Sequence, residues 1–76
     1  MIYTTTDLHF AAVLRALQIP FNGINDAERS IKTFIFQADE SEIAEIKNRY
    51  YLRQLEVDAK TLIEAIKEMK ARVYGD

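Results

Sequence analysis

The sequence has 76 residues and contains no cysteine, no tryptophan, one histidine, one proline and two glycines. Without cysteine the chain forms neither a disulfide nor a thiolate metal site, which is compatible with a reducing cytoplasm. The only glycines are Gly23 and Gly75, so a glycine-rich phosphate-binding loop is excluded. Small domains usually rely on disulfides, metals or partner subunits, so helix packing or oligomerisation must support this one.

Long hydrophobic runs are also missing. The longest apolar stretch, residues 10–17, is interrupted by Arg15 and is far too short to span a bilayer. The first seven residues lack the basic segment of a signal peptide. The formal net charge is −2, unlike that of a strongly basic nucleic-acid domain, although a local basic patch fits within this total. We therefore expect a soluble, cytoplasmic protein with no membrane partner.

The remaining composition is ordinary for a folded protein, with 49% hydrophobic and 29% charged residues. There are no repeats, linkers or low-complexity tracts, which predicts one domain over residues 1–76. A domain of this length buries only about 60–65% of the surface that its unfolded chain exposes, so its core is small.

The first part of the chain predicts a strand and a helix. Residues 2–5 are rich in β-forming residues and suit a short strand. Residues 7–18 suit a helix, with Thr5 or Thr6 as the N-cap and Asp7 in the first turn. One side of this helix is apolar, with Phe10, Val13, Leu14 and Leu17.

Residues 19–24 predict a second strand, and Pro20 places it at a sheet edge because proline cannot donate a ladder hydrogen bond. The pair Asn22-Gly23 is a hairpin signal, but a turn there would leave only a three-residue strand in front of it. We therefore expect a bulge or kink at Gly23 and the turn at residues 25–29, with Asn22-Gly23 as the alternative turn.

Residues 30–38 form the clearest predicted strand, and both of its faces carry large apolar groups. One face has Ile31, Thr33 and Ile35, and the other has Lys32, Phe34 and Phe36. Such a strand is covered on both sides, or its second face meets a partner. We therefore take Ile31, Thr33 and Ile35 as a candidate interface.

Two helices complete the chain. One is predicted from Asp39 to about residues 52–55, with Asp39 and Glu42 as a capping box and an ion pair between Glu45 and Arg49. Its expected buried stripe consists of Ile43, Ile46 and Tyr50, with Ala44 and Tyr51 alongside. The last helix begins after the N-cap Asp58, and its apolar stripe is Leu62, Ile66, Met69 and Val73.

These elements, in the order (β)αββαα, predict an α+β fold of two layers. A small antiparallel hairpin, or a three-stranded sheet, packs on the helices. The third strand would be residues 2–5 or a strand of another subunit, because a hairpin alone is barely stable in water.

Catalytic, cofactor-binding and metal-binding sites are not predicted. His9 has no nucleophile or orienting partner in the sequence and suits a helix surface. Glu64 and Glu68 share a helix face, but nearby Lys60, Lys67 and Arg72 indicate a solvated, ion-paired surface. We expect no enzymatic activity and infer no small-molecule ligand.

The segment of residues 47–53 interleaves basic residues with two tyrosines. Such a pattern can contact phosphates and stack on bases, and the candidate contacts are Lys47, Arg49, Tyr51 and Arg53. The alternative, favoured by the negative net charge, is that the tyrosines pack on the hairpin while the cations pair with Glu45 and Glu56.

Several short segments of the chain together form a recognisable pattern: Thr6-Asp7-Leu8, Ala11-Ala12, Leu14, Phe34-Ile35-Phe36, Tyr50-Tyr51, Leu62, Lys67 and Lys70. This pattern resembles a family of small uncharacterised bacterial, phage and mobile-element proteins. The chain departs from the family pattern at Thr6, where serine is usual, and at Leu52-Arg53, where such proteins often have Asn-Gly. The resemblance implies a phage or mobile-element setting and supplies no activity.

The sequence thus favours a non-enzymatic interaction module that works as a homodimer or as an accessory subunit. A nucleic-acid-associated accessory protein using residues 47–53 is the alternative.

Overall fold

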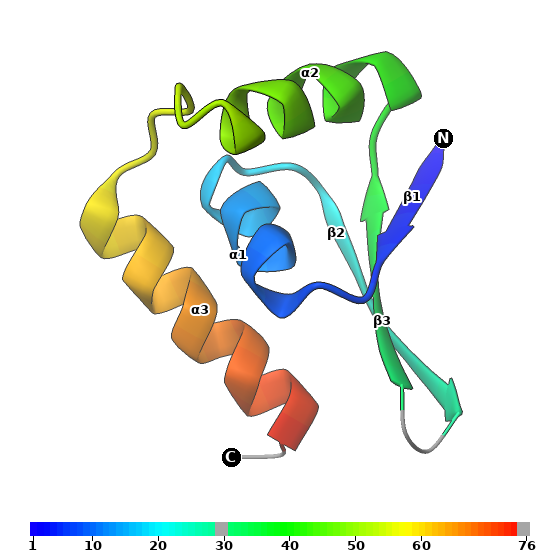
Figure 1. The fold of residues 1–76 in the computed structure, drawn as a ribbon. Helices are drawn as coiled ribbons and strands as arrows, with labels where there is room; N and C mark the ends of the chain where they lie inside the picture. Colours follow the sequence, from blue (N-terminus) through cyan, green and yellow to red (C-terminus); the bar gives the residue numbers. More distant parts are fainter. Residues whose placement is uncertain (29–30, 75–76) are drawn as a thin grey trace.

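The computed structural model describes residues 1–28 and 31–74 and confirms the α+β fold (Figure 1). Its elements follow the predicted order, and the optional first strand belongs to the sheet. They are β1 (Ile2–Thr5), α1 (Leu8–Ala16), β2 (Phe21–Glu28), β3 (Ile31–Gln37), α2 (Glu40–Tyr51) and α3 (Ala59–Tyr74).

The three strands form an antiparallel sheet in the order β1-β3-β2, so β3 is central. Figure 1 shows all three helices on the same side of this sheet, with α1 between the sheet and α3. The alternation of side chains along β3 explains why the helices cover this side: Phe34 and Phe36 lie on it and are buried against them. Tyr3 and Phe21 lie opposite Phe36 in the neighbouring strands and extend the same face.

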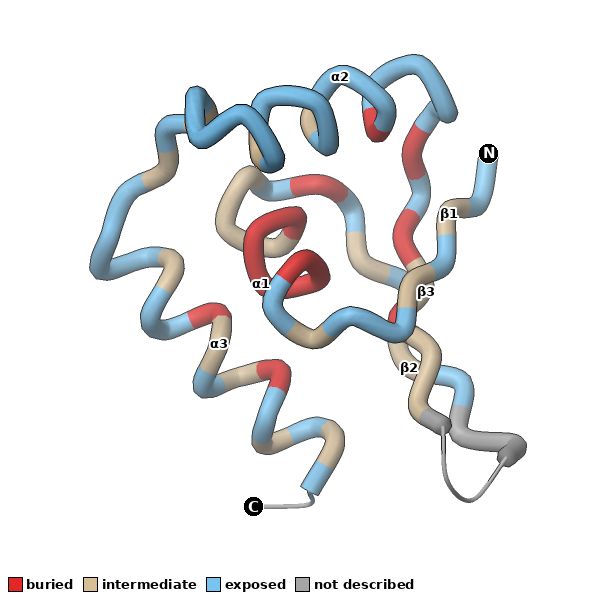
Figure 2. Tube along the Cα trace, in the orientation of Figure 1, coloured by how far each residue is buried: buried red, intermediate tan, exposed pale blue. Residues whose placement is uncertain are grey.

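The core is centred on α1, which is buried on every side over its middle turns (Figure 2). A one-sided stripe was predicted here, but Ala11 and Ala12 are as inaccessible as Phe10 and Leu14. A helix that is apolar all round is an interior helix. Small alanine side chains let the neighbouring elements approach the helix axis closely, which explains why this short helix is the centre of so small a domain.

Both ends of α1 differ from the prediction. Asp7 is itself the N-cap, because its carboxylate accepts a hydrogen bond from the Phe10 amide at 3.1 Å. Thr5 instead accepts from the Asp7 amide through its hydroxyl oxygen at 3.1 Å. The helix ends at Ala16, before the predicted residue 18, because Gln18 adopts a left-handed conformation with φ 65°.

The second strand is longer than predicted. It starts at Phe21, directly after Pro20, and lies at an edge as expected. The predicted bulge is confirmed, since the pairing shifts between Phe21 and Gly23, and Gly23 has φ 122°, which favours glycine. The predicted turn at residues 25–29 is wrong, because β2 continues to Glu28 with a second irregularity. Residues 29–30, between β2 and β3, lie outside the described residues.

The second helix is shorter than predicted and ends at Tyr51, with Arg53 in a left-handed conformation at φ 60°. Asp39 is the N-cap but its side chain makes no capping hydrogen bond. Ile43 is buried, and Ile46 and Tyr50 are half-buried as the predicted stripe requires. Ala44 and Tyr51, expected alongside, are exposed because only a narrow side of this helix contacts the core.

The third helix is capped as predicted, with Asp58 accepting from the Thr61 amide at 2.9 Å and from the Thr61 hydroxyl at 2.8 Å. Its predicted stripe faces α1 and the rest of the core, with Met69 fully buried. Ala65, which was not predicted, is also buried there. The helices and strands therefore leave the opposite face of the sheet without a helical cover (Figure 1).

Candidate interaction surfaces

The face of the sheet opposite to the helices carries the predicted interface residues Thr33 and Ile35. They alternate along β3 with the buried Phe34 and Phe36, so they point away from the helices, and both are half-buried. Ile31 continues this alternation in the backbone of β3, but its side chain lies outside the described part of the structure.

The strand register extends this outer sheet face across all three strands. Thr4 and Gly23 lie on either side of Ile35, and Ile2, which is 59% exposed, lies opposite Gln37. The outward positions with described side chains are all uncharged: Ile2, Thr4, Gly23, Asn25, Thr33, Ile35 and Gln37. In a chain with 29% charged residues, these seven uncharged positions form a distinctive surface. The register also pairs Glu28 with Ile31 at the end of this face, where neither side chain is described.

The two edges of the sheet differ in regularity. The β2 edge follows Pro20 and contains the bulge at Gly23, and both features discourage pairing with a further strand. The β1 edge is regular, and its pairing with the central strand continues through a hydrogen bond from the Ala38 amide to the Met1 carbonyl at 2.9 Å. In the described part of the chain, no strand pairs with the other side of β1.

The predicted nucleic-acid segment begins on the side of α2 that faces the sheet. The Lys47 ammonium lies over the rings of Tyr3 and Phe10, at 5.5 and 5.8 Å from their centroids. Tyr50 packs on Phe10 of α1 with ring centroids 5.4 Å apart, whereas the structural alternative placed the tyrosines on the hairpin. Tyr51 is 69% exposed and packs edge-on with Tyr50, with ring centroids 5.2 Å apart.

Arg49 lies on a different side of α2 from Lys47, because two residues correspond to about 200° of helical rotation. Its guanidinium pairs with Glu45 at 3.1 Å, which confirms the predicted ion pair. Arg53 follows the end of the helix. The structure therefore does not gather the four predicted contacts on one surface.

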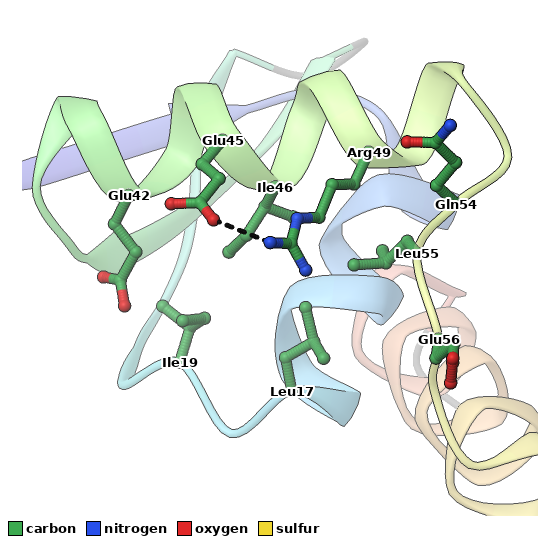
Figure 3. Close-up of a pocket in the computed structure, with 9 residues that line it drawn as sticks. All are labelled: Leu17, Ile19, Glu42, Glu45, Ile46, Arg49, Gln54, Leu55 and Glu56. Atoms are coloured by element: carbon green, nitrogen blue, oxygen red, sulfur yellow. Dashed lines mark ion pairs between the residues drawn. The ribbon is translucent and has the colours of Figure 1, made fainter.

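A groove on the helical side of the molecule was not predicted. It lies between α2, the end of α1 and the irregular segment before α3, and has a volume of about 540 Å³ (Figure 3). Its floor is aliphatic, with Leu17, Ile19, Ile46 and Leu55. Its rim is polar, with Glu42, Glu45, Arg49, Gln54 and Glu56. We call this surface the acidic groove.

The acidic groove carries three carboxylates and a single cation. Figure 3 shows Arg49 reaching over the aliphatic floor toward Glu45, to which it is paired. In the described part of the chain, Glu42 and Glu56 have no cationic partner, so the predicted pairing with Glu56 is not observed. The groove therefore presents a negative rim around an apolar floor.

A polar cluster around Glu68 connects α3 with α1 and β2. Glu68 accepts from Arg15 at 3.3 Å and from Arg72 at 3.1 Å. Both guanidiniums also lie over the Phe21 ring, at 5.5 and 5.1 Å from its centroid. This cluster joins α1, β2 and α3 and is explained by that structural role.

The remaining candidates have simple surroundings. His9 is exposed near the start of α1, and Glu64 is exposed on α3. The predicted ion pairing is found at Glu68, through Arg15 and Arg72, whereas Glu64, Lys60 and Lys67 make no ion pair with any described residue.

Within residues 1–28 and 31–74, no three histidine, aspartate or glutamate side chains lie close enough together to hold a metal ion. In the same part of the chain, no helix has the length and apolar character needed to cross a bilayer.

The acidic groove is not predictable from a local sequence pattern, because its residues come from three separate segments of the chain. The only local signals were Glu42 and Glu45 three residues apart on one helix, and Leu55-Glu56 in the following loop. Comparisons with protein-family models, with curated proteins and with solved structures find no match to this chain.

Proposed function

We propose that this protein is a non-enzymatic interaction module whose outer sheet face binds a second copy of the same chain. The observation that carries the proposal is the set of described side chains around Ile35 on the outer sheet face, none of which is charged, with the exposed Ile2 at its border. The cores of protein interfaces are depleted of charged residues and enriched in apolar area. The described outward side chains share the lack of charge, and Ile2 and Ile35 supply apolar area.

The choice of a second copy follows from charge. The chain has a net charge of −2, so two copies repel each other weakly overall, and most strongly where acidic surfaces meet. The outer sheet face avoids this repulsion because its described side chains are neutral. A twofold arrangement brings the same face of both copies together, and the regular β1 edge borders that contact.

The test is the molar mass in solution, measured by sedimentation equilibrium from about 1 µM to about 500 µM, the range of weak to moderate self-association. We expect a concentration-dependent dimer. Ile35→Lys and Thr4→Lys each place a charge on the outer sheet face, and we expect both variants to remain monomeric. Far-ultraviolet circular dichroism checks that each variant is folded.

The matched control is Ile63→Lys. Ile63 is 54% exposed, close to the value for Ile2, but it lies on α3, away from the sheet. This variant should dimerise like the wild type. A wild-type chain that stays monomeric at the highest concentration, or a dimer that both sheet-face variants leave intact, would contradict the proposal.

The wider setting is also part of the proposal. The resemblance to small phage and mobile-element proteins supports a role as an accessory subunit in such a system, acting in the cytoplasm. Nucleic-acid binding through residues 47–53 stays a prediction and ranks second, because Lys47 and Arg49 point to different sides of α2. A mobility-shift titration over a range of salt concentrations tests it, since phosphate contacts weaken steeply with salt.

A further inference from the structure

We propose that the acidic groove binds a segment of a partner protein that presents a lysine or arginine side chain next to aliphatic side chains. The site is separate from the outer sheet face, because it is formed by α2, the end of α1 and residues 54–56. Peptide binding in the groove therefore does not depend on self-association.

The floor of the groove selects the aliphatic part of the ligand. Leu17, Ile46 and Leu55 are half-buried, so each leaves apolar surface toward the groove, and Ile19 closes the floor. Covering such surface stabilises a complex by roughly 25 cal/mol for each Å² removed from water. The methylene stem of lysine or arginine, together with a neighbouring leucine, supplies a matching surface.

The rim of the groove selects the charge. Glu42 and Glu56 are exposed carboxylates without a cationic partner in the described residues. Arg49 demonstrates the geometry that an incoming cation would adopt, because its guanidinium lies above the aliphatic floor and pairs with Glu45 at 3.1 Å (Figure 3). Glu42 and Glu56 line the same groove and leave two carboxylates for a cation from outside.

The size of the groove favours a few side chains of a peptide over a single ion. Its volume of about 540 Å³ falls within the usual range for ligand sites, about 300–1,000 Å³. An inorganic cation would leave most of the aliphatic floor uncovered, and an acidic or uncharged peptide would leave Glu42 and Glu56 unpaired.

The experiment is a selection of peptides from a random dodecapeptide library on the immobilised protein, followed by affinity measurements with the enriched peptides. We expect enrichment of a lysine or arginine adjacent to leucine, isoleucine or valine. The double variant Glu42→Gln, Glu56→Gln should bind these peptides about tenfold more weakly, a usual loss for removing charged partners at an interface. Wild-type binding should also weaken as salt is raised.

Glu64→Gln is the matched control, because it removes the same charge from an exposed glutamate outside the groove. It should retain wild-type affinity. Ile35→Lys should also retain it, which separates this proposal from failure of the sheet-face dimer. Absence of enrichment, enrichment of peptides without a cation, or an equal loss in Glu64→Gln would overturn the proposal.

Two further results would reassign the groove. If spermidine competes with the peptide and its inhibition constant equals the dissociation constant of the peptide, the groove is a site for small polyamines. If the Glu42→Gln, Glu56→Gln variant abolishes self-association, the groove is occupied by a second copy. Either result would overturn the proposal of a partner peptide.

Discussion

At the scale of single residues, Glu68 is the carboxylate that joins two arginine side chains in the described part of the domain. It receives hydrogen bonds from Arg15 of α1 and Arg72 of α3, and both arginines cover Phe21 of β2. Three elements therefore meet at one carboxylate. Since this carboxylate is about one-third exposed, solvent screening limits the energy that the ion pairs contribute.

Glu68→Gln should lower the free energy of unfolding by about 0.5–1 kcal/mol after allowance for that screening. The amide keeps the shape of the side chain but loses the charge that holds both guanidiniums. Urea denaturation monitored by circular dichroism measures the change. Glu64→Gln, on the same helix without an ion pair, should change stability by less than about 0.3 kcal/mol. Equal effects of the two substitutions would argue against the role of the cluster.

The same carboxylate predicts a pH dependence of stability. Partial burial raises the pKa of Glu68, but the hydrogen bonds and charges of Arg15 and Arg72 outweigh it and hold the pKa below its ordinary 4.5. The hydrogen bond from the Thr61 amide, aided by the Thr61 hydroxyl, lowers the pKa of Asp58 below its ordinary 3.8. The unfolded chain therefore binds these protons at a higher pH than the folded chain does.

It follows that the two carboxylates stabilise the fold fully above about pH 4.5, and that this contribution is lost as the pH falls through their lowered pKa values. Urea titrations between about pH 3 and pH 6 should show the unfolding free energy rising with pH. Glu68→Gln should make that rise shallower. An unchanged slope in this variant would show that other groups govern the acid sensitivity.

At the scale of elements, the two N-caps of α1 and α2 provide an internal comparison. Asp7 accepts a hydrogen bond from the Phe10 amide, whereas Asp39, in the same position of α2, makes no capping bond through its side chain. Asp7→Ala should therefore cost about 1 kcal/mol of unfolding free energy, and Asp39→Ala clearly less. Thermal unfolding by calorimetry measures both. A larger loss for Asp39→Ala would show that the observed capping geometry does not determine stability.

The elements also show where a sequence pattern was sufficient to predict which residues are buried. The alternation in β3 predicted its buried Phe34 and Phe36, and the period of α3 predicted its core-facing stripe with the buried Met69 but not Ala65. Both patterns are informative because each of these elements has one face against the core. The same reasoning failed for α1, which is buried on all sides, and for the end of β2, where residues typical of turns lie in a strand. In both places tertiary packing overrode a local preference.

At the scale of the whole molecule, the small core makes stability sensitive to single cavities. A chain of 76 residues has an expected stability of about 4–11 kcal/mol at 0.05–0.15 kcal/mol per residue. Leu14 is fully buried in α1 at the centre of the domain. The loss of its side chain thus removes a large share of the total.

Leu14→Ala should lower the free energy of unfolding by about 2–5 kcal/mol through lost burial and a residual cavity. Amide hydrogen exchange should report opening throughout the sheet and α3, because α1 contacts both. The control is Leu52→Ala, at a leucine that is 56% exposed, which should change stability by less than about 0.5 kcal/mol. Similar losses in the two variants would contradict the central position of α1.

The sequence by itself determined the order of the elements, the buried face of β3, the bulge at Gly23 and the absence of cysteine chemistry. These properties depend on composition and on residues that are close together along the chain. Only the tertiary structure decided the burial of the middle turns of α1 on all sides and the acidic groove. Each of these depends on how segments that are distant in the sequence come together in space. The residue pattern within one segment does not predict those contacts.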